Sequence, residues 1–274
     1  MFRWLFGFLL VAAIVLNGKP HVQPHVSTPT ALATPVVREE QKVLVDGISE
    51  VWRLEWKSTP KPACGPEDGS SAISCPCSGF AYGESGQLDL VRSTSGRETE
   101  RLELTPFFDK VFADQDGAIV RRWEPQEKEL EESEAEAEAF LKQVPARPLV
   151  TVMRFADYNH DGNSTEFFLQ TGVEPCAKIS GIVVGATLNS PQLHAFGTAL
   201  HPDKPLVMHK REWEALLKAT EPTEVLDWPC GDHGSEIESD LMLSAANGAI
   251  HAVRRQFECT ETGKRGRLLR EQDL

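Results

Sequence analysis

The sequence predicts a mainly β protein built from antiparallel sheets, and three observations support this. Trp52, Leu54 and Trp56 alternate with charged residues, which is the period-2 pattern of a strand with one apolar face. Asn247-Gly248 joins two apolar segments, and this dipeptide is the strongest short signal for a hairpin turn. Short strand-like segments also recur at high density, which favours a sandwich-like arrangement, with propeller-like repeats as the alternative.

The remaining elements are predicted from the same kinds of pattern. Strands are expected over residues 87–92, 101–105, 118–123, 149–155, 166–171, 181–186, 240–246 and 249–257. Residues 93–96 (Ser-Thr-Ser-Gly) make the first two of these a hairpin. Two short helices are expected between strands. The first covers 124–144, with Pro125 in its first turn, and the second covers 211–220, where Trp213 and Leu216 share one face.

The first 45 residues are not expected to belong to the folded domain. Residues 1–18 contain one arginine, an uncharged apolar run and a polar break. This is the pattern of a secretory signal peptide, with a retained N-terminal anchor as the alternative. Residues 19–45 are rich in Pro, Thr, Val and His without an apolar period, which predicts a flexible linker. A β-rich domain is then expected over 46–274, secreted or periplasmic, or facing outward from a membrane if the anchor is retained.

Six cysteines follow the N-terminal segment, and they are Cys64, Cys75, Cys77, Cys176, Cys230 and Cys259. An even number in an exported chain favours disulfides, because the reducing systems of the cytosol are absent there. A proline between Cys75 and Cys77 stiffens their loop, so these two are not expected to pair. We expect a Cys230–Cys259 bond, a bond from Cys64 to Cys75 or Cys77, and a third from Cys176 to the other.

The composition is that of a globular protein and excludes several partners. The 274 residues are 41% hydrophobic and 25% charged, which is enough apolar material for a core. With 41 acidic against 28 basic side chains, the net charge is −13. This balance opposes binding to nucleic acid or to an anionic membrane, and it suits a protein that binds cations.

One segment carries a chemical pattern, the run from Asp157 to Glu166. Ca²⁺ is a hard cation that takes about six to eight oxygen ligands, most readily from closely spaced carboxylates and amides. Oxygens at positions 1, 3, 5 and 7 of a tight loop converge on one point, and a glycine at position 6 allows the sharp turn. The sequence therefore predicts a calcium site with Asp157, Asn159, Asp161, Asn163 and Glu166 as ligands.

The run resembles the Asp-x-Asn-x-Asp-Gly half of EF-hand-type calcium loops. Position 12, where an EF-hand has a bidentate glutamate, is Phe168, and strands are predicted on both sides. Over residues 155–169 the run is more similar to the strand-loop-strand calcium loops of FG-GAP/VCBS-type propeller repeats, which have an acidic residue at position 9. Here position 9 is Thr165 and Glu166 follows. Glu166 is therefore expected to reach the ion only through a local bulge, because a one-residue shift turns a strand side chain to the opposite face.

A metal-free turn held by Asp and Asn side chains is the alternative for this loop. Extracellular calcium modules bind at about 10⁻⁴–10⁻³ M, so a site here is expected to be weak and structural. A similar run at residues 112–117 occurs upstream, at a spacing near the roughly 40–50 residues of a propeller blade. It is the basis of the propeller-like alternative.

The sequence contains no phosphate-binding loop, dinucleotide glycine pattern, His-Glu-x-x-His motif or nucleophile elbow. We therefore expect a binding or structural module for an unknown protein or glycan ligand, with calcium as its cofactor, rather than an enzyme. Two alternatives stay open. One is an exported hydrolase that uses Asp232 and His233, and the other is a carbohydrate-binding module that stacks sugars on Trp52 and Trp56.

Overall fold

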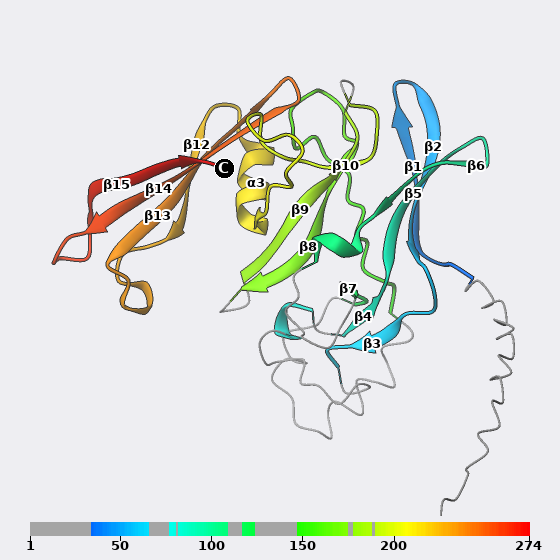
Figure 1. The fold of residues 1–274 in the computed structure, drawn as a ribbon, viewed down its shortest axis with the longest axis horizontal. Coiled ribbons are helices and arrows are strands. Elements are labelled where there is room, and N and C mark those ends of the chain that lie inside the picture. Colours follow the sequence, from blue (N-terminus) through cyan, green and yellow to red (C-terminus); the bar gives the residue numbers. More distant parts are fainter. Residues whose placement is uncertain are drawn as a thin grey trace, which may run out of the picture. The chain divides into compact units, whose positions relative to one another are not determined.

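The computed structural model describes residues 34–65, 77–80, 82–108, 117–123, 147–174, 178–187 and 190–274. Within these ranges the chain is mainly β, with four antiparallel sheets, one α-helix and short 3-10 turns (Figure 1). The predicted fold class is confirmed. Four predictions lie outside the described residues: the N-terminal segment 1–18, the helix 124–144, most of the run 112–117, and the pairing of Cys176 with Cys75.

The first sheet has the strand order β1-β2-β5-β6. Its strands are β1 (Val36–Val45), β2 (Ile48–Trp56), β5 (Leu88–Thr94) and β6 (Arg97–Glu103). Two-residue turns join β1 to β2 at Asp46-Gly47 and β5 to β6 at Ser95-Gly96, and all four turn residues have positive φ. Turns of this kind match the twist of paired antiparallel strands. The predicted hairpin around 93–96 is thus confirmed, with a shorter turn.

Strand β1 lies in the range 19–45, which the sequence analysis assigns to a flexible linker. Val43 and Val45 are buried and alternate with exposed neighbours, and the whole strand pairs with β2. The prediction is therefore wrong for residues 36–45, which belong to the domain. The signal that could have shown this is Asp46-Gly47, because Asp-Gly between apolar segments favours a hairpin.

The second sheet is centred on β9. It consists of β8 (Glu166–Glu174), β9 (Lys178–Gly185), β10 (His194–Ala195) and β11 (Met208–His209), with β8, β10 and β11 all paired to β9. A third, smaller sheet has the order β3-β4-β7, with β3 (Lys61–Ala63), β4 (Gly83–Gly86) and β7 (Ala118–Arg121). Beside it a disulfide joins Cys64 to Cys77, which is one of the two pairings expected for Cys64.

The predicted strand 149–155 is not formed. Its backbone is instead bonded by side chains of β1. Arg38 donates from Nη2 to the carbonyl of Val150 at 3.0 Å, and Glu39 accepts from the backbone N–H of Val152 at 2.7 Å. Side chains of β1 thus take the place of a partner strand, an arrangement that the apolar pattern of the sequence does not reveal.

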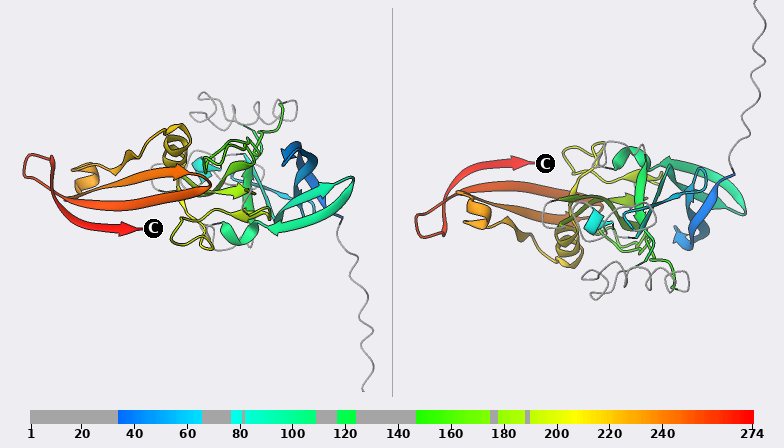
Figure 2. Two further views of the ribbon diagram at one scale, coloured as in Figure 1. Left: turned by 90° about the horizontal axis from the view of Figure 1, so that it is seen from above. Right: turned by 90° about the horizontal axis from the view of Figure 1, so that it is seen from below.

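The fourth sheet has the order β12-β13-β14-β15. Its strands are β12 (Thr223–Trp228), β13 (Ile237–Ala246), β14 (Ala249–Cys259) and β15 (Arg265–Asp273). The long β13–β14 hairpin turns at Asn247-Gly248 as predicted (Figure 2). The expected Cys230–Cys259 disulfide is also present. Helix α3 (Lys210–Lys218) precedes β12 and covers most of the predicted helix 211–220.

Two apolar cores share the second sheet, because β9 is buried on both faces. Ile182 and Val184 pack in one core with the inner side chains of the first sheet, Trp52 among them. Val183 points the other way and packs with Trp213 of α3 and with the fourth sheet. Such a strand reads as a continuous apolar run rather than an alternating one. The second sheet therefore lies between the first sheet and the layer of α3 with the fourth sheet (Figure 1).

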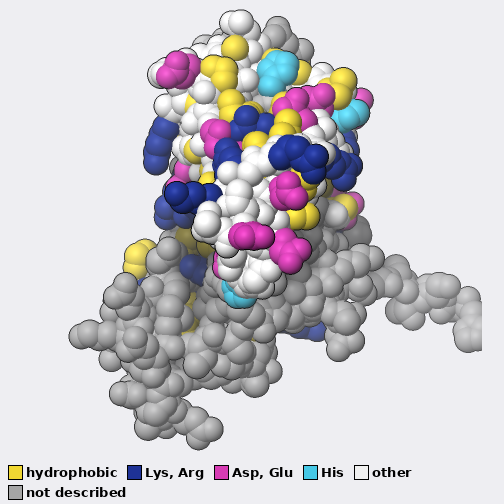
Figure 3. Space-filling view, turned by 90° about the vertical axis from the view of Figure 1, so that its left-hand side faces the viewer, with side chains coloured by type: hydrophobic (Ala, Val, Ile, Leu, Met, Phe, Trp, Pro, Cys, Tyr) yellow, Lys and Arg dark blue, Asp and Glu magenta, His cyan; other side chains and the backbone are white. Residues whose placement is uncertain are grey.

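The side of the molecule formed by the fourth sheet is highly charged. Basic and acidic side chains are interspersed there (Figure 3). Asp240 is fully buried between two arginines, with its Oδ1 at 2.8 Å from Nε of Arg255 and its Oδ2 at 3.0 Å from Nη2 of Arg265. Among the described residues, no helix has the length and apolar character needed to cross a bilayer.

Candidate functional site

The loop that begins at Asp157 is closed by hydrogen bonds to its own backbone. Asp157 accepts with Oδ1 from the N–H of Asp161 and with Oδ2 from that of Gly162, both at 3.0 Å. Asn159 accepts from the same Asp161 N–H at 3.0 Å, and Asp161 accepts from the N–H of Asn163 at 2.9 Å. The side chains at positions 1, 3 and 5 therefore face the inside of the loop, as Asp and Asn do in tight turns.

Glu166 also points into this loop. Its Oε2 accepts a hydrogen bond of 2.9 Å from the N–H of Tyr158, and its side chain is fully buried. The bulge expected for this contact is absent, because Glu166 is the first residue of β8 and the register shift of β8 lies further on. Burial raises the pKa of Glu166 to about 8, and the charges of Asp161 and Asp157 add to this, while the hydrogen bonds that it accepts oppose it.

The other side of the loop rests on the β13–β14 turn. The N–H of Asn247 donates to the carbonyl of His160, and that of Gly248 donates to the carbonyl of Asn159, both at 3.1 Å. Asn159 is fully buried, and its side-chain Nδ2 has no hydrogen-bond partner. Two segments almost ninety residues apart in the sequence thus fix each other, which the local pattern could not predict.

The acidic side chains of the loop are not gathered as closely as ligands around an ion. Among the described residues, one group of three His, Cys, Asp or Glu side chains has ligand atoms within 4.8 Å of one another, and it lies elsewhere, at His209, Glu212 and Asp227. The loop is a hydrogen-bonded turn with three inward-facing carboxylates, and a cation would have to draw them together.

The group at His209 has no counterpart in the sequence analysis. Its members come from three elements, since His209 ends β11, Glu212 lies in α3 and Asp227 lies in β12. The one local signal is the three-residue spacing of His209 and Glu212 at the start of a helix, where Glu212 accepts the backbone N–H of His209. The contact with Asp227, and then that with Glu212, raises the pKa of His209 to about 10 against the opposing effect of burial.

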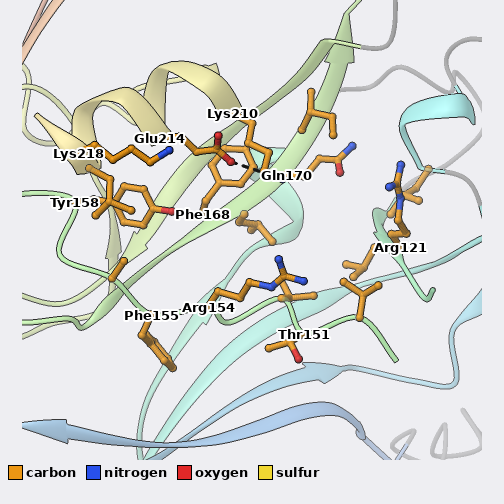
Figure 4. Close-up of a pocket in the computed structure, with 18 residues that line it drawn as sticks. Arg121, Thr151, Arg154, Phe155, Tyr158, Phe168, Gln170, Lys210, Glu214 and Lys218 are labelled. Atoms are coloured by element: carbon orange, nitrogen blue, oxygen red, sulfur yellow. Dashed lines mark ion pairs between the residues drawn. The ribbon is translucent and has the colours of Figure 1, made fainter. Parts of the chain in front are cut away.

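A cavity of about 500 Å³ lies between α3, β8 and the segment 150–156 (Figure 4). Its apolar lining includes Phe155, Tyr158, Phe168, Leu169, Ile179 and Leu217. Its charged lining consists of Arg121, Arg154, Lys210, Lys218 and Glu214. Cavities of roughly 300–1,000 Å³ with apolar walls and a few polar groups are typical of small-molecule sites. Local sequence patterns do not reveal this cavity, because its walls come from segments far apart in the chain.

Tyr158 belongs to both the loop and the cavity. Its backbone is bonded to Glu166, while its ring lines the cavity and meets Trp213 edge-on at 6.0 Å. Burial, followed by the charges of Glu214 and Glu166, raises the pKa of Tyr158 above its usual value. The neutral phenol is therefore the form that faces the cavity.

Asp232 and His233 are adjacent on a short 3-10 turn and do not form a triad with the nearby serine. Nε2 of His233 lies 3.5 Å from Oδ1 of Asp232, and the imidazole side chain is 62% exposed. The hydroxyl of Ser235 donates to the carbonyl of Ile237 at 2.6 Å. A nucleophile, its base and an orienting acid must converge on one point, and these three side chains do not.

Trp52 and Trp56 are both fully buried, in the core between the first and second sheets. A sugar stacks on an aromatic face that solvent can reach. The carbohydrate-binding alternative based on these two residues is therefore wrong. The two tryptophans alternate with charged residues because their side of β2 packs in the core.

Comparison with protein-family models, with curated proteins and with solved structures finds no match for this chain. The resemblance of residues 155–169 to known calcium loops is thus neither supported nor opposed by relatives.

Proposed function

We propose that this chain is an exported binding module whose ligand is a small organic anion with an apolar body, held in the cavity beside α3. The observation that carries this proposal is the charge of the cavity. Four of its five charged lining residues are basic, in a chain whose net charge is −13. Positive side chains that line a cavity in an otherwise negative protein favour a negatively charged ligand there.

Two of the four basic side chains are available for a ligand. Arg121 donates to the carbonyl of Gly79 at 2.8 Å, and Lys210 lies 3.8 Å from Glu214. Arg154 and Lys218, by contrast, make no ion pair with any described residue. They stand on opposite walls, Arg154 on the 150–156 segment and Lys218 at the end of α3 (Figure 4). A carboxylate or sulfonate between these walls would supply the missing negative charge.

The aromatic and aliphatic side chains define the rest of the ligand. Phe168 and Leu217 line the cavity with apolar side chains, which form no hydrogen bonds with a fully polar molecule. Burying apolar ligand area against such walls gains roughly 25 cal/mol per Å². A medium-chain or aromatic carboxylate therefore fits better than an inorganic anion or a sugar.

Export is supported by the two disulfides, because such bonds persist in oxidising compartments outside the cytosol. We place the domain in a periplasmic or extracellular setting, with the segment 1–18 as its signal peptide or anchor.

Calcium at the Asp157–Glu166 loop is the second part of the proposal, and buried Glu166 is the observation that favours it. A fully buried carboxylate near two further carboxylates is costly when ionised and needs a compensating cation or a proton. The ion would take oxygens from Asp157, Asn159 and Asp161, with Glu166 on the inner side. The alternative is the metal-free turn with Glu166 protonated, and the two differ in their response to calcium.

The cavity is tested by titrating the full chain with anilinonaphthalene sulfonate, an aromatic anion that fluoresces in apolar sites, and then by competition. Decanoate should displace the probe, and decylammonium, which has a similar chain and the opposite charge, should not. The double variant Arg154→Gln/Lys218→Gln should weaken decanoate binding about tenfold, equivalent to ~1.4 kcal/mol. The double variant Lys204→Gln/Lys264→Gln, at two exposed lysines outside the cavity, controls for the change in net charge.

A cavity-filling variant completes this experiment. Thr151 lines the cavity from an exposed position, so Thr151→Trp should block the probe without disturbing a core. Equal displacement by decanoate and decylammonium, or unchanged binding by Thr151→Trp, would contradict the proposed ligand class.

A further inference from the structure

We infer that His209, Glu212 and Asp227 bind one divalent transition-metal ion of the Zn²⁺ class. This site is separate from the cavity beside α3 and from the Asp157–Glu166 loop, and the inference does not rest on the proposed function. It follows from the direction in which each of the three side chains is held.

Glu212 is held with one oxygen occupied and the other directed at the imidazole. Its Oε2 accepts the backbone N–H of His209 at 2.8 Å, which closes the first turn of α3. Its Oε1 lies 3.3 Å from Nδ1 of His209 and makes no hydrogen bond, although the residue is only 2% exposed. A buried carboxylate oxygen without a donor is rare, because leaving it unsatisfied costs about 1–3 kcal/mol.

Asp227 also has one oxygen bonded and the other near the imidazole, but this second oxygen is partly exposed and also lies 3.6 Å from Nη2 of Arg211. Its Oδ2 accepts from the hydroxyl of Ser239 at 3.2 Å, and its Oδ1 lies 3.4 Å from Nδ1 of His209. Two carboxylate oxygens therefore approach the same ring nitrogen, and neither meets the geometry of a hydrogen bond with it. One nitrogen can direct a single N–H at a single oxygen, whereas a cation attracts both oxygens and the nitrogen lone pair together.

The opposite side of the imidazole faces a carboxylate, as the ring of a metal-bound histidine usually does. Nε2 of His209 lies 2.9 Å from Oε2 of Glu174, at the end of β8. In metal sites the ring nitrogen that does not bind the ion usually faces a carboxylate, which sets the tautomer and strengthens the other nitrogen as a ligand. The contact does not meet hydrogen-bond geometry in this structure, but a small rotation of the half-exposed Glu174 side chain would let it accept the Nε2 proton and leave Nδ1 for the ion.

The ligand set defines the class of ion. One imidazole with two carboxylates suits zinc and its first-row neighbours, whereas calcium prefers an all-oxygen site. Three protein ligands leave a fourth position of a tetrahedral ion open. A cavity of about 290 Å³ adjoins these side chains, and Ser180 and Arg254 also line it. Water or a small anion could occupy the open position from this side.

The competing arrangement is an imidazolium held by the same carboxylates, and binding experiments separate the two. The full chain, without an affinity tag and freed of metal with EDTA, is titrated calorimetrically with Zn²⁺ and separately with Ca²⁺. We expect one Zn²⁺ to bind per chain. Glu174→Gln should weaken this binding about 10–100-fold, which is the usual effect of losing an outer-shell partner.

Two variants test where the ion binds, and the second of them is the measurement to use if the first fails to fold. His209→Ala should abolish Zn²⁺ binding. Because it also removes a helix-cap contact, Glu174→Gln, in a half-exposed side chain, provides the independent measurement. Glu221→Gln, on the exposed segment after α3, is the matched control and should bind Zn²⁺ as the native chain does. Asp157→Asn should likewise leave Zn²⁺ binding unchanged.

Two results would overturn the inference. One is the absence of Zn²⁺ binding by the folded native chain, which would leave His209 as an ion-paired imidazolium. The other is Zn²⁺ binding of the same strength in His209→Ala and Glu174→Gln, which would place the ion elsewhere. Neither result bears on the binding of decanoate in the cavity beside α3.

Discussion

The backbone N–H of Tyr158 donates a 2.9 Å hydrogen bond to Oε2 of Glu166, while the ring of Tyr158 lines the cavity beside α3. One residue thus belongs to both proposed sites. An ion that engages Glu166 would hold the backbone of Tyr158 in place, and with it one wall of the cavity. Ligand binding and calcium binding are therefore expected to favour each other, as linkage requires when both select one arrangement.

Calcium should stabilise the chain, and Asp157→Asn should remove this effect. At a calcium concentration about tenfold above the dissociation constant, the gain in unfolding free energy is about 1.4 kcal/mol. Thermal unfolding in EGTA and in millimolar calcium measures it. Asp203→Asn, at an exposed position outside the loop, should keep the full calcium response. A native chain with the same midpoint in both buffers would support the metal-free turn.

Without calcium, stability should fall as the pH rises from about 5 to 6.5, and Glu166 should be the cause. Above pH 6.5 the raised pKa of His209 adds a fall of the same sign. The folded-state pKa of Glu166 is raised to about 8, above the ordinary carboxyl value, so the folded chain holds a proton that the unfolded chain has lost. In the window from about pH 5 to 6.5 the free energy of unfolding decreases by up to about 1.4 kcal/mol per pH unit. Denaturant melts in EGTA across the window measure the slope.

Glu166→Gln is the variant that isolates this titration. The amide carries no ionisable proton, so the slope between pH 5 and 6.5 should flatten while the variant stays folded. A slope in Glu166→Gln equal to that of the native chain would show that another group titrates. Saturating calcium should also flatten the native slope, because the ion compensates the ionised carboxylate.

The sequence was sufficient where structure is encoded by neighbouring residues. Asn247-Gly248 predicts its hairpin because both residues tolerate positive φ, and the alternation of Trp52, Leu54 and Trp56 predicts β2. Asp157 and its neighbours predict a loop with inward-facing side chains, which the structure has. These features depend on local chemistry that a short window contains.

The sequence was insufficient where a feature depends on segments brought together by the fold. His209 and Asp227 meet only because α3 returns the chain to β12, and the cavity needs β8, α3 and the segment 150–156 together. The extended segment at Val152 reads as a strand, yet Glu39 of β1 bonds its backbone. Tertiary contacts decide such features, and no single stretch of sequence contains them.

Asp240→Ala should be among the more destabilising substitutions outside the two apolar cores. It removes a buried carboxylate that both Arg255 and Arg265 contact, but the arginines are partly exposed and keep Glu224 and Glu238 as partners, so the loss should be about 1–3 kcal/mol. Urea unfolding gives the difference. The matched control is Glu258→Ala, because Glu258 pairs at 3.7 Å with Arg267 and both side chains are exposed. Such a surface pair contributes about 0–1 kcal/mol, and equal losses from the two variants would contradict the buried network.

Gly47→Ala should destabilise the β1–β2 hairpin through backbone conformation alone. Gly47 has φ of +77°, and a Cβ added there would meet no atom within 4 Å, so no steric clash contributes. An L-residue in this left-handed region costs about 1–2 kcal/mol, and the free energy of unfolding should fall by that amount. Gly47→Asn is the sharper comparison, because asparagine tolerates positive φ better than alanine does. It should retain more stability than Gly47→Ala in the same urea titration, although its side chain is larger. Equal stability of the two variants would contradict a loss that comes from the left-handed backbone conformation at this position.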